Sequence, residues 1–106
     1  MANNFSDAQV TISNNSLTDI VTSSNKSLVI AGTMSNTTSS SINVTLKKYD
    51  ASATATFTIL NTIPLPSGSS LELPKIVLQT SDKIQAQSDN SSGHLTVALQ
   101  MLTDVS

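Results

Sequence analysis

A strict alternation of apolar and polar residues over residues 94–102 constrains this chain more than any other feature. The apolar row comprises Leu95, Val97, Leu99 and Met101, and the opposite row comprises Thr96, Ala98 and Gln100. Successive side chains of a β-strand point to opposite faces, so this period of two predicts a strand with one buried face. Leu102 interrupts the polar row. Residues 71–78 and 83–88 alternate in the same way, which makes the last third of the chain β-structure.

The same pattern recurs in shorter form through the first two thirds. We expect strands at residues 10–12, 16–22, 26–34, 42–47 and 54–61, separated by clusters of Ser, Asn, Pro and Gly. Seven or eight short strands at spacings of about 8–12 residues are typical of a sandwich or barrel. The predicted fold class is all-β, a small antiparallel β-sandwich that is Ig-like or jelly-roll-like.

Three stretches carry more specific expectations. Residues 42–47 and 54–61 predict a hairpin whose core row contains Ala55, Phe57 and Ile59. Pro74 restricts the strand at residues 71–78 to an edge, because proline lacks the N–H that a ladder needs. Apolar residues on both faces of residues 26–34 predict a central strand covered on both sides, in which Gly32 marks a bulge or a close backbone approach. Its predicted rows are Leu28, Ile30 and Met34 against Val29, Ala31 and Thr33.

The length of 106 residues is that of one domain. We expect residues 1–8 to form a flexible N-terminal arm and residues 9–106 to form the β-sandwich. Phe5 is the large apolar residue of this arm. It either covers one end of the core or anchors the arm on a neighbouring subunit.

Charge and composition exclude several classes of protein. The net charge is −2, and the chain contains five Lys and no Arg, the usual reader of phosphate and guanine, so we expect no nucleic-acid partner. The absence of Cys excludes a disulfide scaffold and thiolate chemistry. No basic run or apolar stretch predicts membrane binding, and the first residues do not resemble a signal peptide. We therefore expect synthesis in a cytoplasm.

The residue types that carry chemistry are scattered. His94 is the only histidine, and its place after Gly93 fits an exposed turn. Asp50, Asp82 and Asp89 could meet at one end of a sandwich and hold calcium, but aspartate is also a common turn residue. We predict no catalytic, cofactor-binding or metal site, and we do not expect an enzyme.

The second half of the chain resembles a recurring module of tailed-bacteriophage virion proteins. The resemblance covers about residues 28–102, and its motif is structural. The matching residues are Gly68, Leu71, Leu73, Leu78, Asp82, Ile84, Ala86, Leu95 and Val97. Ser81 departs from the family pattern, which has Gly before the Asp. The resemblance implies a small β-sandwich that is present in many copies and contacts a major capsid or tail protein.

These observations predict a virion structural protein, a capsid cement or decoration subunit localised in the virion. Its expected partners are the major capsid protein or other virion proteins, and the subunit is expected to be a homo-oligomer. A neck, tail or fibre-associated subunit is the alternative within this class, and a carbohydrate-binding module is the alternative from another class. The predicted interface residues are Phe5, Tyr49, Leu65 and Leu102.

Overall fold

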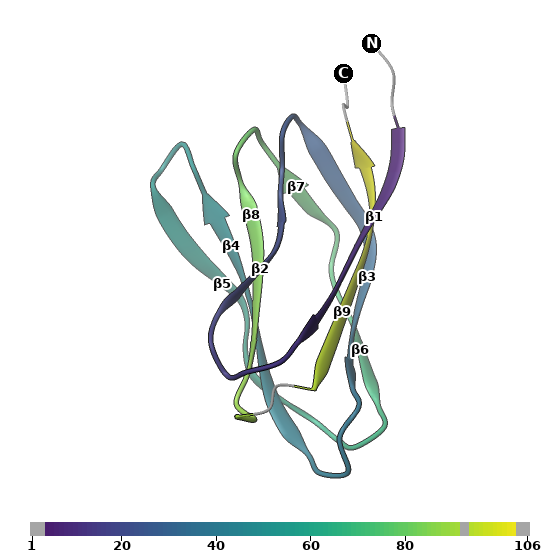
Figure 1. Cartoon of the computed structure of the whole chain (residues 1–106). Coiled ribbons are helices and arrows are strands. Elements are labelled where there is room, and N and C mark those ends of the chain that lie inside the picture. Colours follow the sequence, from purple (N-terminus) through teal and green to yellow (C-terminus); the bar gives the residue numbers. More distant parts are fainter. Residues whose placement is uncertain (1–3, 92–93, 104–106) are drawn as a thin grey trace.

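Nine β-strands and no helix make up residues 4–91 and 94–103, the part of the chain that the computed structural model describes (Figure 1). The strands are β1 (Asn4–Ile12), β2 (Thr18–Thr22), β3 (Ser27–Asn36), β4 (Ile42–Asp50), β5 (Ala55–Leu65), β6 (Ser70–Glu72), β7 (Ile76–Leu78), β8 (Lys83–Ser88) and β9 (Leu95–Thr103). These residues thus include no helix that could cross a membrane. The predicted all-β class is confirmed.

The strands form two antiparallel sheets that pack face to face (Figure 1). The five-stranded sheet has the order β1-β9-β3, with β6 and β7 both paired to the far edge of β3, and the four-stranded sheet has the order β2-β8-β4-β5. Residues 73–75, with Pro74 at their centre, separate β6 from β7 and interrupt the pairing of this segment with β3. If β6 and β7 count as one interrupted strand, the eight strands have the order of a jelly roll.

Aliphatic side chains from the inner faces of both sheets make the core. The buried set is Ile12, Ile20, Val29, Met34, Ile42, Val44, Leu46, Leu65, Leu73, Ile76, Leu78, Ile84, Ala86, Leu95, Val97, Leu99 and Met101. It contains no aromatic residue, so the space between the sheets is filled by branched side chains and methionine. The predicted inward row of the last strand is confirmed.

The N-terminal segment differs from the predicted arm. Its described part, residues 4–8, belongs to β1, which pairs with β9 in an unbroken register from Asn4–Thr103 to Ile12–Leu95. Ser6 and Ala8 lie opposite Met101 and Leu99 on the core side. Because only the second half of β1 has an apolar inner row, sequence alternation alone did not show where the strand begins.

A bulge in β3 changes which of its residues face the core, so the two rows predicted from the sequence are wrong. Between Val29 and Ala31 the register with β9 shifts, so Val29 and Met34 both face the core although one is odd-numbered and the other even-numbered. Gly32 makes a close approach. A Cβ there would lie 2.9 Å from Leu99 Cδ2 and 3.1 Å from the Ala98 carbonyl oxygen.

The predicted hairpin is confirmed as β4 and β5, but Phe57 is not in the core. Phe57 pairs with Lys48 near the turn and its side chain is 54 % exposed. Phe57 lies on β5, which is the edge strand of its sheet and pairs only with β4, so one side of the strand has no neighbouring strand (Figure 1).

Two buried polar residues fix the loops at opposite ends of β4. The Asp82 carboxylate accepts hydrogen bonds from the backbone N–H groups of Ala51 (3.0 Å) and Gln79 (2.9 Å), and Lys48 lies 3.6 Å away. Asn36 donates from Nδ2 to the carbonyl oxygens of Ser40 and Leu65. These bonds join turns that are distant in sequence, so the sandwich has fixed ends.

Candidate interaction surface

Four apolar side chains form a continuous row across the outer face of the five-stranded sheet. The register places Phe5 on β1 opposite Leu102 on β9, Leu102 opposite Leu28 on β3, and Leu28 opposite Val77 on β7. Cross-strand partners share a face. The core residues Val29, Met101, Ile76 and Leu78 are strand neighbours of Leu28, Leu102 and Val77. We call Phe5, Leu102, Leu28 and Val77 the apolar row.

No described residue covers the apolar row. Phe5 is 83 % exposed and Val77 is 52 % exposed at the two ends, while Leu28 and Leu102 are half-buried between their neighbours. Single exposed apolar residues are common on proteins, whereas contiguous apolar patches are typical of interaction surfaces, so this row is the candidate interaction surface.

A second row beside it carries one charge at each end. Asp7 on β1 lies opposite Gln100 on β9, and Gln100 lies opposite Ala31 on β3. Lys75, in the break between β6 and β7, lines the same shallow hollow as Ala31 and Gln100. A carboxylate and an ammonium group therefore stand at opposite edges of one row.

The described residues in the rest of this outer face have small or uncharged side chains, except for Glu72. Gln9 and Ala98 are partners, as are Ala98 and Thr33, and Glu72 follows Thr33 at the edge. The last row is formed by the hydroxyl residues Thr11, Thr96, Ser35 and Ser70.

Two of the four predicted interface residues come together on this surface. Phe5 and Leu102 are direct cross-strand partners. Leu65 is only 3 % exposed and belongs to the core, so its side chain is closed to any partner. Tyr49 lies on the other sheet, where it is the register partner of Lys83.

Sequence reasoning did not include Leu28 and Val77 among the predicted interface residues. The signal was present in β3, because apolar residues occur on both of its faces. The prediction that both faces are covered holds only for the inner face within the described residues. The β3 bulge obscured which residues face outward, and Val77 was hidden between two inward-facing residues of a three-residue strand.

The outer face of the four-stranded sheet has a different character. Asp19 accepts hydrogen bonds from Gln85 Nε2 (2.8 Å) and Lys83 Nζ (3.3 Å), and the Lys83 Nζ lies 5.9 Å from the centre of the Tyr49 ring. The hydrogen bond from Gln85, with a smaller effect from Lys83, holds the pKa of Asp19 below its ordinary value. The Asp19 carboxylate on this face is thus already bonded to Lys83 and Gln85.

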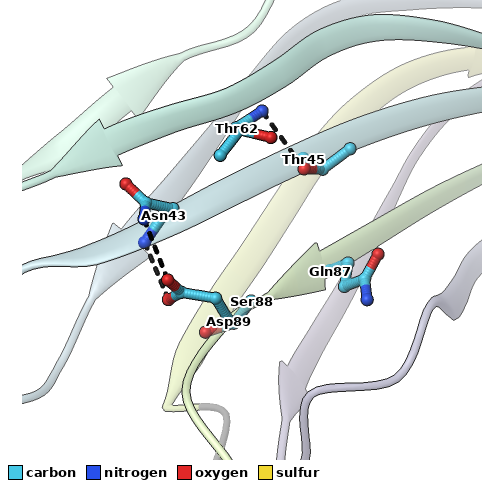
Figure 2. Close-up of a pocket in the computed structure, with 6 residues that line it drawn as sticks. All are labelled: Asn43, Thr45, Thr62, Gln87, Ser88 and Asp89. Atoms are coloured by element: carbon cyan, nitrogen blue, oxygen red, sulfur yellow. Dashed lines mark hydrogen bonds between the residues drawn. The ribbon is translucent and has the colours of Figure 1, made fainter.

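A polar hollow of about 190 Å³ lies on the same sheet, between β4, β5 and β8 (Figure 2). Asn43 donates to both carboxylate oxygens of Asp89, from its backbone N–H and from Nδ2, each at 2.9 Å. Figure 2 shows Gln87 turned away from this pair. Because the carboxylate is already bonded and no aromatic ring lines the hollow, its composition does not favour the carbohydrate-binding alternative.

The carboxylates considered for calcium do not converge. Asp50 and Asp82 lie at the β4–β5 turn, whereas Asp89 bonds to Asn43 at the other end of β4. Within residues 4–91 and 94–103, no three His, Asp or Glu side chains are grouped as metal ligands. His94 is exposed, and its carbonyl oxygen accepts hydrogen bonds from the backbone N–H and hydroxyl of Thr37.

Comparison with known proteins gives a fold rather than a family. No protein-family model matches the chain, and no curated protein matches it. Among solved structures, a subunit described as belonging to Bacillus endospore appendages, "a novel family of disulfide-linked pili", aligns over 100 % of this chain and 93 % of its own, with a TM-score of 0.56 and 16 % identity.

Two further solved structures align less closely. A pentameric capsid protein from metagenomic phage sequences has a TM-score of 0.48 and 20 % identity, and the alignment covers 94 % of this chain but only 60 % of the capsid chain. The globular domain of a zebrafish complement 1qA protein has a TM-score of 0.36 and 13 % identity, over 92 % of this chain and 69 % of its own. The strand order of its two sheets makes the chain an antiparallel jelly-roll β-sandwich.

Proposed function

We propose that this chain is a structural subunit of a bacteriophage virion, a cement or decoration protein that stabilises the particle through protein–protein contacts. The observation that carries the proposal is the apolar row on the outer face of the five-stranded sheet. The partners are the major capsid protein or other virion proteins, together with further copies of the chain.

The energetics favour a contact role for this row. Removing a fully exposed Phe, Leu or Val side chain from water contributes roughly 1.5–3 kcal/mol. Phe5 and Val77 therefore contribute most, and the half-buried Leu28 and Leu102 add less. On the other outer face, the Asp19–Lys83 ion pair and the hydrogen bond from Gln85 to Asp19 lie on neighbouring strands instead. The virion setting is supported by the sequence resemblance of residues 28–102 to phage virion modules.

The copy number of the chain in particles tests the virion role. We expect mass spectrometry of purified virions of the encoding phage to find hundreds of copies, near parity with the major capsid protein or a simple fraction of it. About a dozen copies would place the chain at the neck or tail instead. Absence from particles would refute a virion function.

A pair of phenylalanine variants tests the surface. Phe5→Ser removes the most exposed member of the apolar row, and Phe57→Ser removes a 54 % exposed phenylalanine at the edge of the other sheet. In a co-sedimentation assay with particles that lack the subunit, we expect Phe5→Ser to bind weakly and Phe57→Ser to bind like the unmodified chain. Equal binding by both variants would show that the row is not the contact.

A further inference from the structure

We propose that the apolar row is a self-complementary interface, through which two copies of the chain pack their five-stranded sheets face to face about a twofold axis parallel to the strands. The inference rests on the proposed function only in treating the row as an assembly surface. It names a second copy of the chain as the molecule that covers the row, so the weaker particle binding expected of Phe5→Ser reflects lost pairing between subunits on the particle.

The apolar row matches itself under this rotation. The axis passes between β9 and β3, so β1 of one copy lies over β7 of the second and β9 lies over β3. Phe5 then faces Val77 of the second copy, and Leu102 faces Leu28. A twofold axis perpendicular to the strands would instead place most of the row against the hydroxyl rows or outside the contact.

The neighbouring row supplies charge complementarity. Asp7 and Lys75 stand at opposite edges of the sheet, and the same rotation brings Asp7 of each copy over Lys75 of the other. Two opposite-charge pairs form, related by symmetry as a twofold interface requires. Such charge pairs mainly speed the encounter of the two copies and fix the register of their packing, and they add less to the affinity.

The remaining rows oppose no like charges. Gln9 faces Glu72, so an amide N–H group meets a carboxylate, and Ala98 faces Thr33. The hydroxyl residues of the last row face one another. Small side chains let two sheets approach to the roughly 10 Å at which sheets pack face to face.

The size of the face sets the expected affinity. Four strands about 4.8 Å apart and about nine residues long give a face of roughly 19 Å by 30 Å, or about 550 Å² in projection. This is below the roughly 800 Å² per partner of a standard interface, so we expect a dimer with a dissociation constant on the order of micromolar.

Sedimentation velocity of the full chain, over a concentration series, tests the arrangement through charge reversal. Asp7→Lys opposes lysine to lysine at both contacts, and Lys75→Asp opposes aspartate to aspartate. Each variant alone should dimerise roughly tenfold or more weakly than the unmodified chain. Mixed in equal amounts, the two variants should form a heterodimer, because both of its contacts again join opposite charges.

Two further variants complete the test. The double variant Asp7→Lys/Lys75→Asp should dimerise with itself, and Lys47→Glu on the other sheet should leave dimerisation unchanged. A chain that stays monomeric at millimolar concentration, or a mixture that stays monomeric while circular dichroism shows folded variants, would overturn the inference. Neither result would bear on the copy number in virions, so the two proposals fail separately.

Discussion

Gly32 lies where three segments of the five-stranded sheet crowd together. Its carbonyl oxygen accepts a hydrogen bond from the Leu73 N–H at 2.9 Å, and Leu73 Cδ1 lies 3.2 Å from the position a Cβ would occupy. The neighbouring Ala98 oxygen is backbone and cannot rotate away. The absence of a side chain therefore allows the break between β6 and β7 to close over β3.

A Gly32→Ala substitution tests this packing. The added methyl group would displace Leu99, which is fully buried, so we expect a loss of about 1–3 kcal/mol in the free energy of unfolding by urea. Gly68→Ala is the matched control. It meets no atom within 4 Å and pays only for its positive φ of 72°, about 1–2 kcal/mol. A Gly32→Ala variant as stable as the unmodified chain would show that the neighbouring side chains can shift to accommodate the methyl group at no cost.

Asp82 stabilises the fold at the hairpin end. Its two carboxylate oxygens accept from backbone N–H groups of separate turns, and its side chain is 1 % exposed. Asp82→Ala leaves those groups without an acceptor, and we expect a loss of about 3 kcal/mol by thermal or urea unfolding. Asp89→Ala, at an exposed carboxylate with a similar pair of bonds, should lose about 1 kcal/mol. Equal losses would contradict the role of burial.

At the scale of elements, β1 is the segment whose role changes most between sequence and structure. Its first residues are an edge strand that covers Leu99 and Met101 of β9. Removing it would expose buried side chains and leave one side of the β9 ladder unpaired. The segment contributes to both the fold and the apolar row.

Deletion of residues 1–8 should therefore destabilise the chain as well as impair assembly. We expect the free energy of unfolding in urea to fall by a few kcal/mol and the m-value to fall with it, because less surface is buried. Phe5→Ser provides the comparison, since it removes the exposed side chain but keeps the strand. Unchanged stability of the truncated chain would mean that β1 before Gln9 adds nothing to the fold.

The pairing of β2 with β8 carries a measurable pH signature. Asp19 on β2 has its pKa lowered chiefly by the hydrogen bond from Gln85 on β8. This lowering stabilises the folded chain at pH values above the pKa of Asp19 in the unfolded chain, about 3.9. The stabilisation is lost as the pH falls through the lower pKa of Asp19 in the folded chain.

Gln85→Ala should raise the pKa of Asp19, measured by NMR titration of its carboxyl carbon. Gln87→Ala is the control on the same strand, because Gln87 donates to the Asn15 carbonyl oxygen instead. An Asp19 pKa that does not rise in the Gln85 variant would assign the lowering to Lys83, the weaker of the two contacts.

The alternation of apolar and polar residues predicted the strands whose inward-facing rows are continuous. It failed where the direction of a side chain depends on the register with a distant strand. Leu102 was marked by its break in the polar row of β9, and it does face outward. The bulge at Ile30 arises from the register with β9, which lies some 70 residues further along the chain. Leu65 is buried at the end of β5, where its carbonyl oxygen accepts a hydrogen bond from Asn36, a residue 29 positions earlier in the chain. Such features belong to contacts between distant segments and leave no local period.

For the molecule as a whole, the outer faces of the two sheets differ in their surface chemistry. One face presents the apolar row together with Asp7, Glu72 and Lys75, and the other presents hydrogen-bonded polar pairs such as Asn43–Asp89 and Asp19–Gln85. A subunit built this way has one face for a partner and one for water. This asymmetry suits a protein that lies on or in a larger assembly.

The pairing of β1 with β9 also bears on how the chain is made. The first described strand has its only ladder partner in the last described strand, from Asn4–Thr103 to Ile12–Leu95. During synthesis β1 leaves the ribosome long before β9 exists, so the five-stranded sheet forms after translation of nearly all the described chain. Sheets closed by such distant contacts fold in milliseconds to seconds. Until then the backbone of β1 has no ladder partner and its inward residues Val10 and Ile12 stay exposed, so the surface that contains Phe5 and Leu102 is assembled late.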